Sequence, residues 1–357
     1  MIQKANMKSK EDPVCSLFND CRGCSYQDIP YEDELSIKEK ELKDLINELL
    51  EVDPDCFEPI VPSPKPYHYR NRLDLKLLKT KSKEVFIGFT PKSRHGVIPI
   101  ESCYIAREEI SSFIPELKKQ AIDKLPENYR LANLVVRSGE DGRVFWGGIG
   151  KKSLLQEEGD FFWVEIEGKK IFYSLDTFFQ ANISILPSVF QKIKSLGIWG
   201  NDVVFYDLYG GVGLFGVGMV DSVSKVVLIE ESIPSLRLAK YNVEYHDLKN
   251  FKIIEGRVED HFLDMVNEEE NGKRVAMIDP PRAGLSQSAL DLLVSAKGIG
   301  WMLYLSCNPK TLARDLGRFV ANNWNIEKII PFDFFPKTAH LETLVLLKKF
   351  NCGEICY

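Results

Sequence analysis

The stretch Trp301-Met-Leu-Tyr-Leu-Ser-Cys-Asn-Pro-Lys-Thr-Leu-Ala-Arg-Asp315 decides the fold. Its apolar first third ends in Ser-Cys-Asn-Pro, which predicts a buried strand followed by a helix that begins near Lys310. Cys307 then lies just past the carboxyl end of a strand, where open α/β sheets bind their ligands. The positive charges of Lys310 and Arg314 are expected to favour its thiolate. A packed, inert cysteine is the alternative interpretation.

A second stretch near the C-terminus adds a carboxylate. Phe335-Pro-Lys-Thr-Ala-His-Leu-Glu342 directly precedes the apolar run Thr343–Leu347, which we expect to form a core strand. Glu342 at the start of this strand is a candidate general base.

The C-terminal half predicts an α/β fold. From Ile183 onward, helical segments alternate with short apolar strands, which indicates a doubly wound, Rossmann-like parallel sheet with helices on both faces. We assign residues 177–357 to this domain. The expected strands are Val203–Leu208, Lys225–Ile229, Phe251–Ile254, Val275–Ile278, Trp301–Leu305 and Thr343–Leu347.

The first half predicts an α+β, largely antiparallel fold, which we divide into residues 1–105 and 106–176. Apolar residues recur at helical spacing from Glu34 to Glu51, and a second helix is expected from Ala106 to Asp123. Turn signals join several strands as hairpins. The expected strands are Leu73–Leu77, Val85–Phe89, Ala132–Ser138, Arg143–Ile149, Phe161–Glu167 and Lys170–Leu175.

Composition argues against a membrane protein or a secreted disulfide scaffold. Apolar residues make up 44% of the 357 residues, but no run approaches the roughly 20 residues that cross a bilayer, and no signal peptide is visible. We therefore expect a cytoplasmic protein with no membrane partner. Its eight cysteines should stay reduced unless they bind metal or do chemistry.

Positive charge is concentrated in one segment although the formal net charge is -6. The segment from Pro62 to Arg107 contains ten Lys and Arg residues, including Arg94, and only three acidic residues. Tyr and Phe residues are interleaved, which is the mixture expected of an RNA-binding surface. A solvated face of a sheet is the alternative.

The cysteines near the N-terminus predict a metal centre. Cys15, Cys21 and Cys24 form a C-x5-C-x2-C cluster, and Cys103 can supply a fourth thiolate. Four thiolates in a reducing compartment suit zinc or an iron–sulfur cluster, and the spacing alone does not choose between them.

A glycine-rich loop predicts a nucleotide-like cofactor. Asp207-Leu-Tyr-Gly-Gly-Val-Gly-Leu-Phe-Gly216 follows the first strand of the C-terminal half, and Glu230 ends the next strand. Glycines let a ligand approach the backbone closely. Asp207 would oppose a pyrophosphate but suits a cation, and Glu230 can bind ribose hydroxyls, so S-adenosyl-L-methionine fits better than NAD.

A rigid loop with an acidic residue follows the fourth strand. The sequence Asp279-Pro-Pro-Arg282 lies at the same edge of the predicted sheet, and its prolines stiffen the loop that presents Asp279. Arginine stands where amino-group methyltransferases carry an aromatic residue. Together with the downstream Cys307, this difference favours methylation of carbon through a covalent adduct.

These motifs resemble the bacterial RNA uracil-5 methyltransferases over nearly the whole chain. The matching residues are the four cysteines, Phe178-Phe-Gln180, Asp207-Leu-Tyr-Gly-Gly-Val-Gly213, Asp279-Pro-Pro-Arg282, Ser306-Cys-Asn-Pro309 with Thr311-Leu-Ala-Arg-Asp315, and His340-Leu-Glu342.

The resemblance implies that Cys307 is the nucleophile and Glu342 the base in S-adenosyl-L-methionine-dependent methylation of uridine carbon 5. It also implies a [4Fe-4S] cluster, as in the members that modify 23S ribosomal RNA, and no obligate protein partner. The residues implied to line the cofactor and base pocket are Gln180, Tyr209, Glu230 and Asp279, and those implied to hold the cluster are Cys15, Cys21, Cys24 and Cys103.

Two other functions stay open, namely a transfer RNA uridine-54 methyltransferase and a non-catalytic iron–sulfur RNA-binding protein. The chain also departs from the family. The family often has Asn where Leu214 stands and another near Arg257. Because few residues precede Cys15, we expect no oligonucleotide-binding-like domain. The cysteines that match no family position are Cys56, Cys352 and Cys356.

Overall fold

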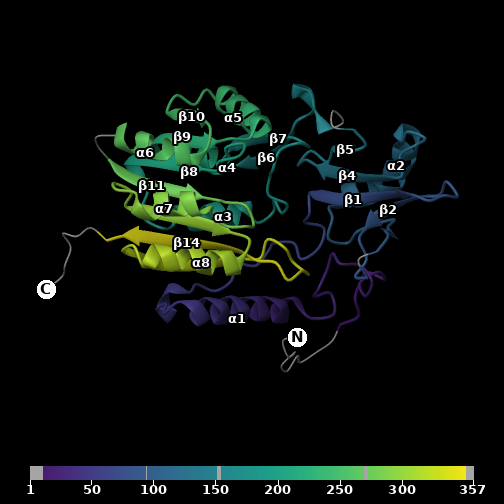
Figure 1. Cartoon of the computed structure of the whole chain (residues 1–357), viewed down its shortest axis with the longest axis horizontal. Coiled ribbons are helices and arrows are strands. Elements are labelled where there is room, and N and C mark those ends of the chain that lie inside the picture. Colours follow the sequence, from purple (N-terminus) through teal and green to yellow (C-terminus); the bar gives the residue numbers. More distant parts are fainter. Residues whose placement is uncertain (1–10, 94, 151–153, 269–271, 351–357) are drawn as a thin grey trace.

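The computed structural model describes residues 11–93, 95–150, 154–268 and 272–350. Arg94, Cys352 and Cys356 lie outside these ranges. The described residues form a seven-stranded sheet, a five-stranded sheet and a separate two-stranded hairpin (Figure 1).

The seven-stranded sheet has the order β10-β9-β8-β11-β12-β14-β13. The chain first builds outward from β8 through β9 to β10, and then returns to the other side of β8 with β11 and β12. This reversal creates a switch point, and ligands of α/β sheets bind at the carboxyl ends of the strands there. The strands are β8 (Gly200–Leu208), β9 (Val223–Glu230), β10 (Phe251–Glu255), β11 (Lys273–Ile278), β12 (Trp301–Ser306), β13 (Trp324–Phe332) and β14 (Glu342–Lys349).

Helices cover both faces of this sheet, which confirms the α/β prediction. Alternate residues of β8 point to opposite faces, so Val203 and Phe205 belong to one apolar core and Val204 and Tyr206 to the other. The first core is covered by α3 (Leu186–Lys194), α4 (Leu214–Met219) and α5 (Ile233–Tyr245). The second is covered by α1 (Tyr31–Leu49), α6 (Val258–Glu268), α7 (Gln287–Ser295) and α8 (Pro309–Val320).

The prediction that this sheet is parallel throughout was wrong at one edge. Strand β14 is antiparallel to both of its neighbours, β12 and β13. Strand β13 was not predicted because polar residues interrupt its sequence, and Pro331 lies within it. An edge strand tolerates proline, and a bulge between Ile326 and Lys328 breaks its alternation.

The five-stranded sheet has the order β3-β2-β1-β4-β5 and is antiparallel, as predicted for the first half. Its apolar face packs against α2 (Glu108–Lys124). The strands are β1 (Arg72–Lys79), β2 (Val85–Phe89), β3 (Ile98–Pro99), β4 (Leu131–Ser138) and β5 (Val144–Gly147), and the separate hairpin consists of β6 (Phe162–Ile166) and β7 (Lys169–Tyr173).

Helix α1 belongs to the first half of the sequence but lies beside α8, against the seven-stranded sheet (Figure 1). It begins three residues earlier than predicted, directly after Pro30. Within the described residues, none of the helices combines the length and apolar character needed to cross a membrane.

Candidate active site

The loop between β8 and α4 is built for close approach to its backbone. Tyr209 and Gly213 both have positive φ, at 60° and 88°. A Cβ atom on Gly210 would lie 2.6 Å from the side chain of Leu228, so only glycine fits there. The next residue, Gly211, has no described residue except its chain neighbours within 4 Å of the position of a Cβ atom, so the loop leaves its backbone accessible there.

Two carboxylates flank this loop. Asp207, at 2% exposure, accepts a 2.8 Å hydrogen bond at Oδ2 from the amide of Gly216. Burial, together with the charges of Asp279 and Glu230, raises the pKa of Asp207 to about 8 despite the hydrogen bond from Gly216, which lowers it. Glu230 ends β9 and accepts hydrogen bonds from the amides of Gly211 (2.9 Å) and Ser232 (2.7 Å). A bound cation would be favoured here because it would stabilise Asp207 in its ionised form.

Asp279 follows the carboxyl end of β11, next to β8 in the sheet. Its Oδ2 atom accepts a 3.2 Å hydrogen bond from Nε2 of Gln180. The pKa of Asp279 is raised to about 7, because burial outweighs the Gln180 hydrogen bond, which lowers it. The structure therefore brings together two of the residues predicted to line the pocket, although they are far apart in sequence.

Cys307 lies in the short turn between β12 and α8, as predicted. Asn308 caps α8 by accepting a hydrogen bond from the amide of Lys310, and its Nδ2 donates to the carbonyl of Arg282 at 3.0 Å. The last pair between β12 and β14 is Ser306 with Thr343, so Cys307 and Glu342 are the next residues along the two antiparallel strands. The strand pairing thus places the predicted nucleophile beside the predicted base.

Electrostatic interactions connect these groups. The pKa of Cys307 is raised to about 11, because burial and the charge of Glu342 raise it more than the charge and hydrogen bond of Arg282 lower it. Burial and the charge of Asp279 hold the pKa of Glu342 well above its ordinary value, while Arg282 lowers it. Cys307 is therefore largely a neutral thiol near pH 7 in the absence of ligands, and burial shifts Glu342 toward its neutral form.

The expectation that Lys310 and Arg314 favour the thiolate was wrong. Lys310 is exposed on the first turn of α8, and neither residue is among the main influences on the pKa of Cys307. Arg314 instead forms a 2.6 Å ion pair with the buried Asp315. The cation beside the thiol is Arg282, in the loop after β11.

Tyr209 and Leu214 follow β8, and Arg257 follows β10. The Tyr209 side chain packs against the core under α6 and α7, and the charge of Glu259 adds to the effect of burial in raising its pKa. Leu214 is buried as the first residue of α4. Arg257 pairs with Glu259 at 2.9 Å on the surface.

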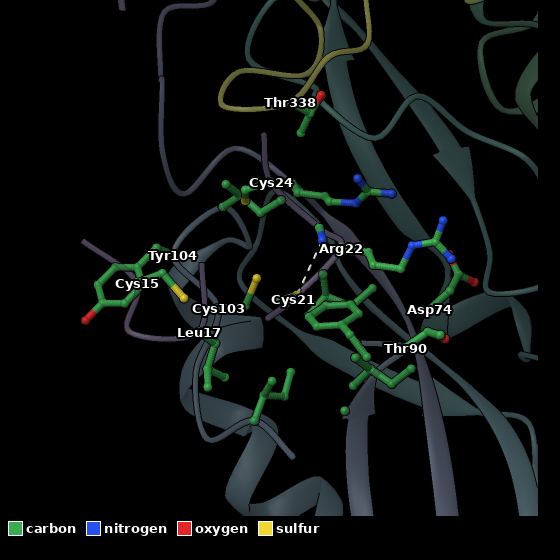
Figure 2. Close-up of a pocket in the computed structure, with 18 of the residues that line it drawn as sticks. Cys15, Leu17, Cys21, Arg22, Cys24, Asp74, Thr90, Cys103, Tyr104 and Thr338 are labelled. Carbon is green, nitrogen blue, oxygen red and sulfur yellow. Dashed lines mark hydrogen bonds between the residues drawn. The ribbon is translucent and has the colours of Figure 1, made fainter. Parts of the chain in front are cut away.

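The four predicted cluster cysteines line one cavity of about 650 Å³. Figure 2 shows them labelled around the same part of this cavity. Burial and the charges of the other three cysteines raise the pKa of Cys24 to about 12, although a hydrogen bond with Gln27 lowers it. Arg282 and His340 also line this cavity, so the four thiols share one space with Arg282, which interacts with Cys307.

A metal ion is not preorganised at this place. In the described part of the chain, no group of three or more His, Cys, Asp or Glu side chains is arranged to hold a metal ion. Cys56 lies elsewhere, beside β13 of the seven-stranded sheet, where its Sγ donates to the carbonyl of Ile326 at 3.1 Å.

Two buried basic residues were missed by the sequence analysis. Arg137 donates to the carbonyls of Ser174 (2.6 Å) and Thr177 (3.0 Å), in the segment that leads to Gln180. Lys38 is 3% exposed on α1. A usable signal existed for both, since Arg137 ends an apolar run on β4 and Lys38 lies four residues before Leu42 on the buried stripe of its helix.

The fold and the loops at its switch point define a Rossmann-like methyltransferase architecture. The model of the family described as tRNA (Uracil-5-)-methyltransferase matches residues 149–350, which is more than half of the chain. The chain therefore belongs to this family. It is an S-adenosyl-L-methionine-dependent RNA uracil-C5 methyltransferase. This result removes the non-catalytic alternative.

Individual relatives agree with the family over most of the chain. An uncharacterized RNA methyltransferase of Clostridium tetani is 28% identical over 95% of this chain and 84% of its own length. The 23S rRNA (uracil(1939)-C(5))-methyltransferase RlmD of Haemophilus influenzae is 27% identical over 97% of this chain and 84% of its own. The solved Pyrococcus abyssi tRNA (uracil-54, C5)-methyltransferase, in complex with S-adenosyl-L-homocysteine, shares the fold with a TM-score of 0.70 and 23% identity over 92% of this chain and 86% of that one.

Proposed function

We propose that the enzyme methylates carbon 5 of a uridine in 23S ribosomal RNA through a covalent adduct between Cys307 and carbon 6 of the base. The observation that carries this proposal is the position of Cys307 and Glu342 side by side at the ends of β12 and β14, with Asp279 and Arg282 in electrostatic contact.

Addition of the thiolate would begin the reaction. Carbon 5 of uracil is a poor nucleophile until a sulfur atom adds to carbon 6 and makes the ring enolate-like. Arg282 lowers the pKa of Cys307 and so favours the thiolate. The target base must be unstacked to reach this buried turn, at a cost of a few kcal/mol, which favours uridines in loops.

Elimination would complete the reaction. After carbon 5 has taken the methyl group, its proton must leave before the sulfur can. Glu342 is placed for this step, and its raised pKa makes its carboxylate a stronger base than an exposed glutamate. Loss of this proton re-forms the carbon 5 to carbon 6 double bond and releases the Cys307 thiolate.

The residues around the glycine loop fit S-adenosyl-L-methionine, which supplies the methyl group as an electrophile when bound. No described residue except its chain neighbours lies within 4 Å of the position that a Cβ atom on Gly211 would take, so the backbone is open to a ligand there. The buried carboxyl of Asp207 suits a cationic ligand, and Glu230 retains acceptor capacity for ribose hydroxyls. Gln180 and Asp279 would hold the polar edge of the uracil between them.

The cavity beside the active site supports an RNA path. Basic side chains from the cysteine loop, the five-stranded sheet and the catalytic loops line the same space, namely Arg22, Arg70, Lys76 and Arg282. Arginine and lysine that line a groove bind phosphates. The flanking strand of the RNA would lie in this cavity while the target uridine enters the Cys307 site.

The four cysteines around the cavity would hold a [4Fe-4S] cluster. They supply the four thiolates that such a cluster requires. A cluster distributes these thiolates over several iron atoms, so they need not converge on one ion. An anaerobic preparation should be brown and contain iron and sulfide, and Cys24→Ser should lose both. A colourless protein that contains zinc would refute this assignment.

The choice of ribosomal over transfer RNA rests on the cysteine set and on the Haemophilus relative. The Pyrococcus structure and the family description favour transfer RNA as the second candidate. Mapping 5-methyluridine in both RNAs from cells that lack the gene decides between them. Loss of one modification from 23S ribosomal RNA is expected, and loss from transfer RNA alone would overturn this choice.

A further inference from the structure

A group of four buried charged side chains lies behind the segment that joins β13 to β14. Glu34 and Lys38 come from α1, and Asp333 and Lys337 come from the segment itself. Each is at most 3% exposed. Two acids and two bases give no net charge, which is the condition under which buried charges are tolerated. We call these four residues the buried quartet.

Lys38 is the centre of the buried quartet. Its Nζ donates to Oε1 of Glu34 and to Oδ1 of Asp333, both at 2.7 Å, and to the carbonyl of Phe335 at 3.2 Å. The second oxygen of Asp333 accepts a 2.8 Å hydrogen bond from the hydroxyl of Tyr31. Helix α1 therefore holds the start of the segment through two side chains.

Lys337 joins the same segment to the cysteine loop. Its φ of 64° is unusual for a residue other than glycine, and its amide donates to Oε1 of Glu34 at 2.7 Å. Its carbonyl accepts hydrogen bonds from the amides of Ser25 (2.8 Å) and Tyr26 (3.2 Å), which directly follow Cys24. The cysteine loop, α1 and the segment thus meet at one residue.

The segment carries Glu342 into the active site. Phe332 at the end of β13 pairs with Glu342 at the start of β14, so the segment begins and ends at this pair. Asp333 follows Phe332 directly, and its amide donates to the carbonyl of Val61 at 2.9 Å. A shift of Asp333 would therefore move Phe332 and, through the strand pairing, Glu342.

We propose that Lys38 is a positioning residue for methyl transfer: through Asp333 and Glu34 it fixes the segment 333–341, and so sets Glu342 against Cys307. The inference rests on the proposed role of Glu342 as base. Lys38 itself does not touch the reacting atoms. The buried quartet makes the geometry of the base depend on α1 and on the loop that follows Cys24.

The test compares Lys38→Met with Lys40→Met. Lys40 lies on the same helix in an exposed pair with Asp44, with side chains 78% and 66% exposed, so the chemical change is matched but the site is not buried. Misplacement of a catalytic group by about 1 Å costs about 100-fold in rate. We therefore expect Lys38→Met to lower turnover by about 10- to 100-fold, with unchanged S-adenosyl-L-methionine affinity. Lys40→Met should behave as the wild type.

The distinguishing readout is the covalent intermediate. If Glu342 is displaced, addition and methylation continue while elimination slows, so a methylated enzyme–RNA complex should accumulate on a denaturing gel. A change that only destabilised the fold would lower activity without accumulating this complex.

Tyr31→Phe is the second variant, because Lys38→Met removes a buried charge and can prevent folding. It deletes only the hydroxyl that bonds Asp333 and the amide of Ser63. The same accumulation at a smaller loss of turnover is expected. Wild-type turnover without extra complex in Tyr31→Phe, or in a folded Lys38→Met, overturns the positioning role. If Glu342→Gln itself traps no complex, the assignment of the base has failed instead.

Discussion

The amide nitrogen Nε2 of Gln180 donates a 3.2 Å hydrogen bond to Oδ2 of Asp279, which joins the segment after β7 to the loop after β11. This bond counteracts the burial that raises the pKa of Asp279 to about 7. The ionised carboxylate is the form that can accept a hydrogen bond from the N3–H group of uracil. Activity should therefore rise with pH through the pKa of Asp279.

Gln180→Leu should move this rise to higher pH. Removal of the donor leaves burial unopposed, so the pKa of Asp279 increases and a smaller fraction is ionised near pH 7. The pH profile of kcat/KM measures the shift. Gln287→Leu is a matched control, because Gln287 bonds Asp291 in an exposed pair. An unshifted profile in an active Gln180→Leu enzyme would contradict the proposed role of the pair.

Arg282→Gln should make the Cys307 thiol less reactive. Arg282 lowers the pKa of this thiol by its charge and a hydrogen bond, so its loss raises the pKa further above 11. Each unit of pKa reduces the thiolate at a given pH about tenfold. Alkylation of Cys307 by iodoacetamide without RNA measures this directly. Lys310→Gln should alkylate at the wild-type rate, and equal slowing in both variants would refute the assignment.

The stability of the ligand-free enzyme should fall with rising pH because of Asp207. Its pKa is about 8 in the folded chain and about 3.9 when unfolded, so the folded state binds the extra proton. This contribution is complete below about pH 4 and is lost as pH rises to about 8. In urea unfolding, Asp207→Asn should gain a few kcal/mol relative to the wild type between pH 5 and pH 8. A constant difference between the two proteins would contradict this pKa.

Arg137→Met should destabilise the segment that carries Gln180. The guanidinium is fully buried, lies over the ring of Tyr173 and donates to backbone carbonyls of residues 174 and 177. Leaving these carbonyls unpaired should cost about 3 kcal/mol or more in the free energy of unfolding. Arg130→Met, at an exposed position, is the control. Equal stability of the two variants would show that Arg137 does not hold this segment.

Local patterns were sufficient to predict the residues at strand ends. Cys307 and Asp279 each follow an apolar run, and the carboxyl ends of the adjacent parallel strands β12 and β11 lie at the same edge of the sheet. The antiparallel position of β14 was not predictable in this way, because pairing partners depend on the whole sheet. It is this pairing that places Glu342 beside Cys307.

Contacts between distant segments explain the remaining failures. The sequence suggested Lys310 and Arg314 because they are close to Cys307 along the chain, whereas Arg282 reaches the thiol through the fold. Lys38 looks like a solvated residue of an amphipathic helix until Asp333, almost three hundred residues later, is placed against it. A charged residue on the apolar stripe of a predicted helix is the sequence signal for a buried charged group of this kind.

The most direct test of the account is the fate of the RNA in Glu342→Gln. Incubated with substrate RNA and S-adenosyl-L-methionine carrying a labelled methyl group, this variant should form a complex that survives denaturation and contains the label. The double variant Cys307→Ala with Glu342→Gln should form none. A folded Glu342→Gln enzyme that releases methylated RNA without any such complex, or a Cys307→Ala enzyme that still methylates, would contradict the covalent mechanism.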